Sequence, residues 1–227
     1  MSVETHRVLM GTCGWKHPAW NNDFYSEDLP EDWQLGFYAN EFPVVYVPAS
    51  EWIEATDLDE WSEDVSETFR FILELPANVL KDENTFVVAI NKAKLLGEFC
   101  LGFVFQLDTE VASDISLLKK RYDVARLVAS VCIDSHEITL STDFERFLKE
   151  QNITKVWNGK DMKQDATTAS LSICRISGEN VDMAGLRRVI EGCLSDSSEH
   201  CVSVLCLDGE PPSLEQLRNA DTILNLL

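Results

Sequence analysis

The run CLGFVFQL, residues Cys100–Leu107, is almost wholly apolar and stops at Asp108. A continuous apolar run of this length is typical of a strand buried on both faces, as in a parallel sheet. Seven other runs of similar character occur along the chain: Arg7–Gly11, Pro43–Val47, Phe69–Leu75, Arg126–Ile133, Ile153–Trp157, Ala169–Ile176 and Cys201–Leu207. Together they predict a mainly parallel sheet of eight strands.

Helical patterns separate these runs. Apolar residues recur at helical spacing over four segments: Glu31–Phe42, Glu83–Phe99, Val111–Arg121 and Val181–Leu194. The sequences TDFE, residues 142–145, and SLEQ, residues 213–216, have the form of capping boxes and predict the starts of two more helices.

Strand and helix alternate about eight times, and parallel strands of one sheet are joined by right-handed crossovers. The sequence therefore predicts an α/β fold, a TIM-like (β/α)8 barrel formed as a single domain by residues 1–227. The βα unit near residues 153–169 should be short or irregular, because the polar segment there leaves little room for a full helix. A doubly wound open sheet is the alternative.

The charge balance is strongly acidic. The chain of 227 residues has 39 Asp and Glu against 19 Lys and Arg, a formal net charge of −20. Such a surface repels phosphate backbones, so no nucleic-acid partner is expected. The acidity either serves solubility or forms a face for a basic protein partner.

The seven cysteines lack the CxxC and Cys/His spacings of metal sites, and four of them lie in apolar strand-like runs. This is typical of reduced cysteines that behave as small buried hydrophobes. Residues 1–6 do not have the form of a signal peptide, and no apolar run approaches the ~20 residues of a membrane span. We therefore expect a cytoplasmic protein with no membrane partner.

The loop after the first predicted strand begins with GTCGW, residues 11–15. Its glycines permit a sharp bend. Cys13 would need a nearby base to act as a nucleophile, and His17 stands four residues on, but an inert packed cysteine is the preferred interpretation. Trp15 and Trp20 are expected to pack over the barrel mouth, or to line a site in which a ligand stacks.

In a TIM barrel, functional side chains come from the carboxyl ends of the strands. Arg175 lies near the end of the seventh predicted strand, and a buried arginine needs a partner. That partner is either a carboxylate, such as Glu74 or Asp208, or an anionic ligand. Glu74 and Gln106 lie near the ends of the third and fourth strands. They act as acid/base and orienting group, or they form a structural network with Arg175.

Asp134 and His136 follow the fifth predicted strand and form a candidate acid/base pair. The chain has four histidines and no HExxH sequence, so no metal site is expected. It also has no P-loop and no GxGxxG sequence, so no cofactor is expected.

The N-terminal stretch over residues 11–42 resembles a known family. GTCGWKHPAWNNDFYSEDLPEDW, residues 11–33, and LGFYANEF, residues 35–42, are similar to the opening signature of the YecE-like family known as domain of unknown function 72. Gln106, Arg175 and the closing pair 219–220 match later family motifs more loosely. The resemblance implies a TIM-like barrel.

The sequence departs from the family pattern where the strands end. Val45–Trp52 stands where the family has a polar motif after its second strand. The family's Lys-x-Pro is replaced by Glu74-Leu75-Pro76. Its Glu-Phe-Arg-His strand is replaced by Ala129–Ile133, which lacks the charged pair. Ser177 stands for a family histidine, and a closing Asn-Asn is replaced around Asp208. Because the family has no assigned activity, the resemblance implies a fold and a candidate pocket, not a reaction.

Two functions remain open. The first is a divergent barrel that binds a ligand or protein partner without established catalysis, motivated by the lost polar residues and the acidic surface. The alternative is an enzyme or binder acting on a small anionic substrate, bearing phosphate or carboxylate, at the carboxyl-end mouth. The residues proposed to contact a ligand are Trp15, His17, Trp20, Gln106 and Arg175, with Glu74 and His17 as weak catalytic candidates.

A mouth filled by Trp15, Trp20 or Trp52 would favour the first function. An open polar cavity that holds Arg175 without a carboxylate partner would favour the second.

Overall fold

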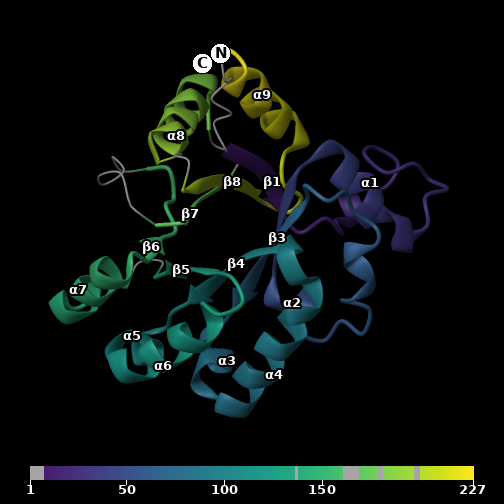
Figure 1. The fold of residues 1–227 in the computed structure, drawn as a ribbon. Helices are drawn as coiled ribbons and strands as arrows, with labels where there is room; N and C mark the ends of the chain where they lie inside the picture. The colour runs from purple at the N-terminus through teal and green to yellow at the C-terminus, as the bar shows by residue number, and fades with distance from the viewer. Residues whose placement is uncertain (1–7, 136–137, 161–168, 178–180, 197–199) are drawn as a thin grey trace.

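The structure is a computed structural model that describes residues 8–135, 138–160, 169–177, 181–196 and 200–227. Eight parallel strands form one sheet in the order β6-β5-β4-β3-β2-β1-β8-β7, with helices around it (Figure 1). The strands are β1 (Val8–Cys13), β2 (Val44–Val47), β3 (Arg70–Leu75), β4 (Cys100–Gln106), β5 (Ser130–Asp134), β6 (Thr154–Lys155), β7 (Leu171–Ser177) and β8 (Val202–Asp208).

The sheet curls until its two edges nearly meet. Strand β6 has only two residues and pairs with β5. Just beyond β6, the main chain of Trp157 bridges to β7: its N–H donates to Ile173 O at 2.9 Å, and Arg175 N–H donates to Trp157 O at 2.8 Å. The fold is thus the predicted TIM-like barrel. The short β6 agrees with the irregular unit expected near 153–169, although residues 161–168 lie outside the described residues.

Most helices lie in the predicted segments, with several breaks, but the short helices over residues 49–52 and 77–81 were not predicted. They are α1 (Gln34–Glu41), α2 (Ala49–Trp52), α3 (Ala77–Lys81), α4 (Glu83–Ala93), α5 (Thr109–Ser113), α6 (Ile115–Ala125), α7 (Thr142–Gln151), α8 (Met183–Asp196) and α9 (Leu214–Leu224). Short 3-10 turns are η1 (Pro18–Trp20), η2 (Glu31–Trp33), η3 (Glu60–Ser62) and η4 (Lys94–Phe99). No described helix is both long enough and apolar enough to span a membrane.

Three boundaries differ from the sequence prediction for local reasons. The expected helix over 111–121 is divided at Asp114, whose carboxylate caps α6 by accepting from Leu117 N–H at 2.9 Å. The expected strand Arg126–Ile133 begins only at Ser130, because the main chain after α6 continues in hydrogen-bonded turns. Helix α7 is capped by the hydroxyl of Ser141 and not by Thr142.

The core has two parts. Inside the barrel, small and medium side chains pack together, including Val44, Ile72, Val104, Ile173 and Val204. A larger cluster fills the space between the strands and the helices, and most of the buried aromatic side chains belong to it. All seven cysteines are buried, and none of them forms a disulfide bond.

Candidate functional site

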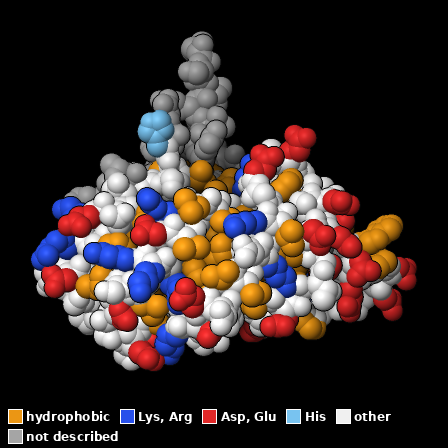
Figure 2. Space-filling view, turned by 60° about the horizontal axis from the view of Figure 1, so that its bottom comes forward, with side chains coloured by type: hydrophobic (Ala, Val, Ile, Leu, Met, Phe, Trp, Pro, Cys, Tyr) orange, Lys and Arg blue, Asp and Glu red, His pale blue; other side chains and the backbone are white. Residues whose placement is uncertain are grey.

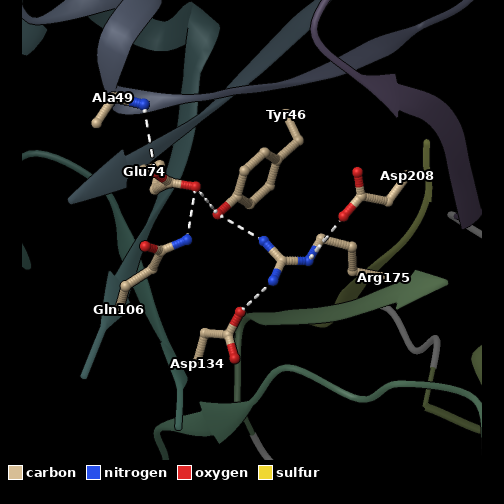
Figure 3. A network of polar contacts seen from close by, with 7 residues as sticks. All are labelled: Tyr46, Ala49, Glu74, Gln106, Asp134, Arg175 and Asp208. Atoms are coloured by element: carbon tan, nitrogen blue, oxygen red, sulfur yellow. Dashed lines mark hydrogen bonds and ion pairs between the residues drawn. The ribbon is translucent and has the colours of Figure 1, made fainter. Parts of the chain in front are cut away.

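Six polar side chains from six strands meet at the carboxyl end of the barrel (Figure 3). Each lies on the last or one of the last residues of its strand, so the closed parallel sheet brings them to one rim. We call this set the mouth network: Tyr46 on β2, Glu74 on β3, Gln106 on β4, Asp134 on β5, Arg175 on β7 and Asp208 on β8.

Arg175 is at the centre of the mouth network. Its NH2 group donates to Asp134 Oδ2 at 2.7 Å, and its Nε lies 3.8 Å from Asp208 Oδ2. Its NH1 group donates to the Tyr46 hydroxyl at 3.2 Å, and the guanidinium stacks over the Tyr46 ring at 5.3 Å. The Arg175 side chain is 15% exposed and that of Asp134 is 7% exposed, so this ion pair is largely removed from solvent.

Glu74 forms the second half of the network. Its Oε2 accepts from the Tyr46 hydroxyl at 2.9 Å and from Gln106 Nε2 at 2.7 Å. Its Oε1 accepts from the main-chain N–H of Ala49 at 3.4 Å. Tyr46 therefore joins the two halves, since its hydroxyl donates to Glu74 and accepts from Arg175.

Burial raises the pKa of the Tyr46 phenol well above its usual value, and the neighbouring Glu74 charge raises this pKa further. The phenol is therefore protonated at neutral pH, which agrees with its role as a donor to Glu74. With three carboxylates and one guanidinium, the mouth network as a whole is negative.

The GTCGW loop supplies structure to the same rim. A methyl group on Gly11 would collide with the carbonyl group of Val44 on β2, so only glycine allows β1 and β2 to approach there. Gly14 has φ +71°, in the region that favours glycine. The Thr12 hydroxyl donates to Gly14 O at 2.7 Å, which fixes the bend after the strand.

Cys13 and His17 approach each other, but not as a nucleophile and its base. His17 Nε2 donates to the carbonyl oxygen of Cys13 at 2.9 Å, and His17 Nδ1 lies 3.8 Å from a Glu210 carboxylate oxygen. Burial raises the pKa of the Cys13 thiol well above its usual value. The thiol is therefore neutral at physiological pH, and its burial does not favour attack on a substrate.

The tryptophans of the loop lie in the core. Trp15 is 1% exposed and packs edge-on against Trp61 at 4.8 Å, while Trp20 is 2% exposed and stacks on Tyr38 at 6.4 Å. Trp52 is fully buried, and its indole N–H donates to the Glu74 carbonyl oxygen at 2.9 Å. Neither Trp15 nor Trp20 presents an open ring face to solvent.

The comparison with known families agrees with this architecture. A family model described as "Protein of unknown function DUF72" matches residues 9–200. The chain belongs to the DUF72 family. A crystal structure at 2.20 Å resolution of a DUF72 family protein from Thermotoga maritima MSB8 matches with a TM-score of 0.73 over 97% of this chain and 99% of that one. At 15% identity this likeness concerns the fold alone. No curated protein matches the chain.

The sequence of this DUF72 chain predicts part of the mouth network. Glu74, Gln106 and Arg175 do lie on one rim, and Asp208 is 3.8 Å from Arg175. The short contact to Arg175 comes instead from Asp134, which the sequence paired with His136. His136 lies outside the described residues.

Tyr46 was missed as a polar group, because a tyrosine inside an apolar run resembles a core residue. Its only signal was its place at the end of the second strand, where the family pattern has polar residues.

Neither of two cavities of this DUF72 chain is lined by a residue of the mouth network. Within the ranges that the structure describes, no three His, Cys, Asp or Glu side chains are grouped to hold a metal ion. A cavity of about 520 Å³ lies at the amino ends of β5 and β7, lined by Tyr122, Ser130 and Ser170 among others. Another, of about 320 Å³, lies between η1 and the start of α9.

Proposed function

We propose that this DUF72 protein acts by binding a protein partner, without catalysis, and that its mouth network serves the stability of the barrel. The ion pair between Arg175 and the buried Asp134 carries this proposal. A guanidinium that already has a carboxylate at 2.7 Å is not free to clamp a substrate anion.

The charge of the mouth also weighs against an anionic substrate. Among the described residues of the mouth network, Arg175 is the one cation and Asp134, Asp208 and Glu74 are carboxylates, so an incoming phosphate or carboxylate would meet net negative charge from this set. Displacing Asp134 from Arg175 would leave a buried carboxylate without its charge partner, which is costly. The buried tryptophans of the GTCGW loop support the same proposal, since they offer no open platform for a ligand.

The location proposed for this function is the cytoplasm. None of the seven cysteines forms a disulfide bond, which suits a compartment that keeps thiols reduced.

A thermal-shift screen tests the structural role of Arg175. Wild type and Arg175→Gln are melted with and without phosphate, sugar phosphates, nucleotides and carboxylates. We expect no anion to raise the Tm of wild type. Arg175→Gln should lose about 3 kcal/mol, because it leaves Asp134 buried without its charge partner. For a chain of this size that lowers Tm by roughly 6 °C or more.

The matched control is Arg126→Gln. Arg126 is 53% exposed, and its ion pair with Asp123 lies at the surface, so its loss should cost less than about 1 kcal/mol. A Tm increase with one anion that is present in wild type and Arg126→Gln, but absent in Arg175→Gln, would contradict the proposal and indicate a working anion site.

A further inference from the structure

Acidic residues are concentrated in one part of the chain. Residues 17–69 contain 14 of the 39 acidic residues and none of the 19 basic ones, whereas the rest of the chain has 25 acidic against 19 basic. This segment includes α1 and the loops around it, on the right of the barrel in Figure 1. Acidic side chains dominate that side in Figure 2, while the left side mixes both signs. The net charge is therefore unevenly distributed.

These carboxylates are not neutralised within the protein. All 14 acidic residues except Glu51 are exposed. Within the described part of the chain, none of these 13 forms an ion pair with a lysine or arginine. Lys92 approaches the segment, but its ammonium group donates to the main-chain carbonyl of Ile53 at 2.6 Å. A patch of exposed carboxylates that are not neutralised by nearby cations attracts positively charged partners.

An exposed tryptophan lies inside the same patch. Trp33 is 68% exposed, although tryptophan is usually well buried, and it directly follows Glu31 and Asp32 in η2. One helical turn further, Phe37 is 38% exposed, and its ring is held in place by Phe24 at 5.2 Å. Because Trp33 and Phe37 are four residues apart, the two side chains lie on the same side where η2 continues into α1, and together they form an apolar strip.

The acidic loop before β3 packs against α1, the helix that carries Phe37. A methyl group on Gly36 would stand 3.1 Å from the carbonyl oxygen of Asp64, so α1 packs closely on the loop that follows η3. Glu63 and Asp64 are both exposed there. We call residues 31–41 and 53–67 together the acidic–aromatic face.

We propose that the acidic–aromatic face binds a segment of another protein that is rich in lysine and arginine. Two independent features select that chemistry. The carboxylates attract the positive charge over distance, and the ring face of tryptophan is the best side-chain partner for a cation at contact. Exposed tryptophan is also among the residues that contribute most to protein interfaces. A second copy of this chain does not fit, because each copy carries −20. The inference rests on the proposed binding function, but it uses a surface separate from the mouth.

The test measures binding of a fluorescent deca-lysine peptide at low salt by anisotropy. The face variants are Trp33→Ala and the double variant Glu31→Gln with Asp32→Asn. The controls are Leu127→Ala, which removes another exposed apolar side chain (80% exposed), and the double variant Glu83→Gln with Glu150→Gln, which removes the same charge from exposed residues of α4 and α7. Thermal melting verifies that each variant is folded.

We expect each face variant to weaken peptide binding at least five-fold. Trp33→Phe should recover part of the affinity that Trp33→Ala loses. Both controls should bind the peptide within two-fold of wild type. Equal weakening by the charge control would mean that only total acidity matters, and it would overturn the proposal. So would undiminished binding by Trp33→Ala, or self-association of the wild type that depends on Trp33. These outcomes leave the anion screen at the mouth unaffected, so the two proposals fail separately.

Discussion

Arg175 and Asp134 are 41 positions apart in the chain, and the contact between them decides how the barrel mouth is interpreted. The arginine needed a partner because an unpaired buried charge is costly. The partner is an aspartate at the end of β5, which the strand register places opposite Gln106 at the end of β4. Each charged group of the mouth network thus has a polar or charged partner within the fold.

Glu51 carries a carboxylate in an unfavourable, partly buried environment. It follows β2 in α2, and its Oε2 atom is buried without a hydrogen-bond partner. Burial raises the pKa of this carboxyl, with Lys16 opposing the shift and Glu210 adding to it. A raised folded-state pKa means that the native state binds the proton more tightly than the unfolded chain, so stability falls as pH rises from the unfolded value of about 4.3 through the folded pKa.

We therefore expect Glu51→Gln to be more stable than wild type at pH 7, by about 2 °C in Tm. The advantage should shrink as pH falls and vanish near pH 4, where the wild-type carboxyl is protonated in both states. Melting curves of both proteins from pH 4 to pH 8 measure this. A constant difference between the two across that range would show that the carboxyl charge is not the cause.

The start of helix α7 is set by the side-chain hydrogen bond that caps it. The sequence placed the cap of α7 at Thr142, because TDFE matches a capping box. The structure uses Ser141, whose extended backbone lets its hydroxyl accept from Phe144 N–H at 3.2 Å. Both Ser141 and Thr142 carry a hydroxyl, so the residue type does not show which of them caps the helix. The backbone conformation decides which hydroxyl does so.

Ser141→Ala should destabilise the protein by about 1 kcal/mol, through the loss of this cap. Thr142→Ala is the matched control, and it should cost less because Thr142 is the first residue inside the helix. Urea unfolding of the three proteins gives the two differences. If Thr142→Ala proved the more harmful substitution, the helix would begin where the sequence pattern indicated.

For the stability of the whole molecule, the clustering of acidic residues in one segment matters more than the total net charge. Thirteen exposed carboxylates in residues 17–69 repel one another and oppose the compact state. At physiological ionic strength this repulsion is screened beyond about 8 Å.

We expect the Tm of wild type to rise by several degrees between 10 mM and 500 mM NaCl, since salt screens the repulsion among these residues. A variant with Glu60, Glu63 and Asp64 changed to their amides should show a smaller rise. Differential scanning calorimetry in matched buffers measures both. A Tm that falls with salt in wild type would mean that attractive pairs dominate the surface.

The sequence alone determined a parallel sheet of eight strands, and it favoured a closed barrel over a doubly wound open sheet. Burial on both faces forces a parallel strand to be apolar throughout, and that pattern can be read one run at a time, as at Cys100–Leu107. It also determined that Glu74, Gln106 and Arg175 share a rim, because strands of a barrel all end on the same side.

Only the tertiary structure decided what these residues do there. The choice of Asp134 as the partner of Arg175, the joining role of Tyr46 and the burial of Trp15 and Trp20 depend on strand register and on packing between distant segments. Such contacts link residues far apart in sequence, and no local pattern records them.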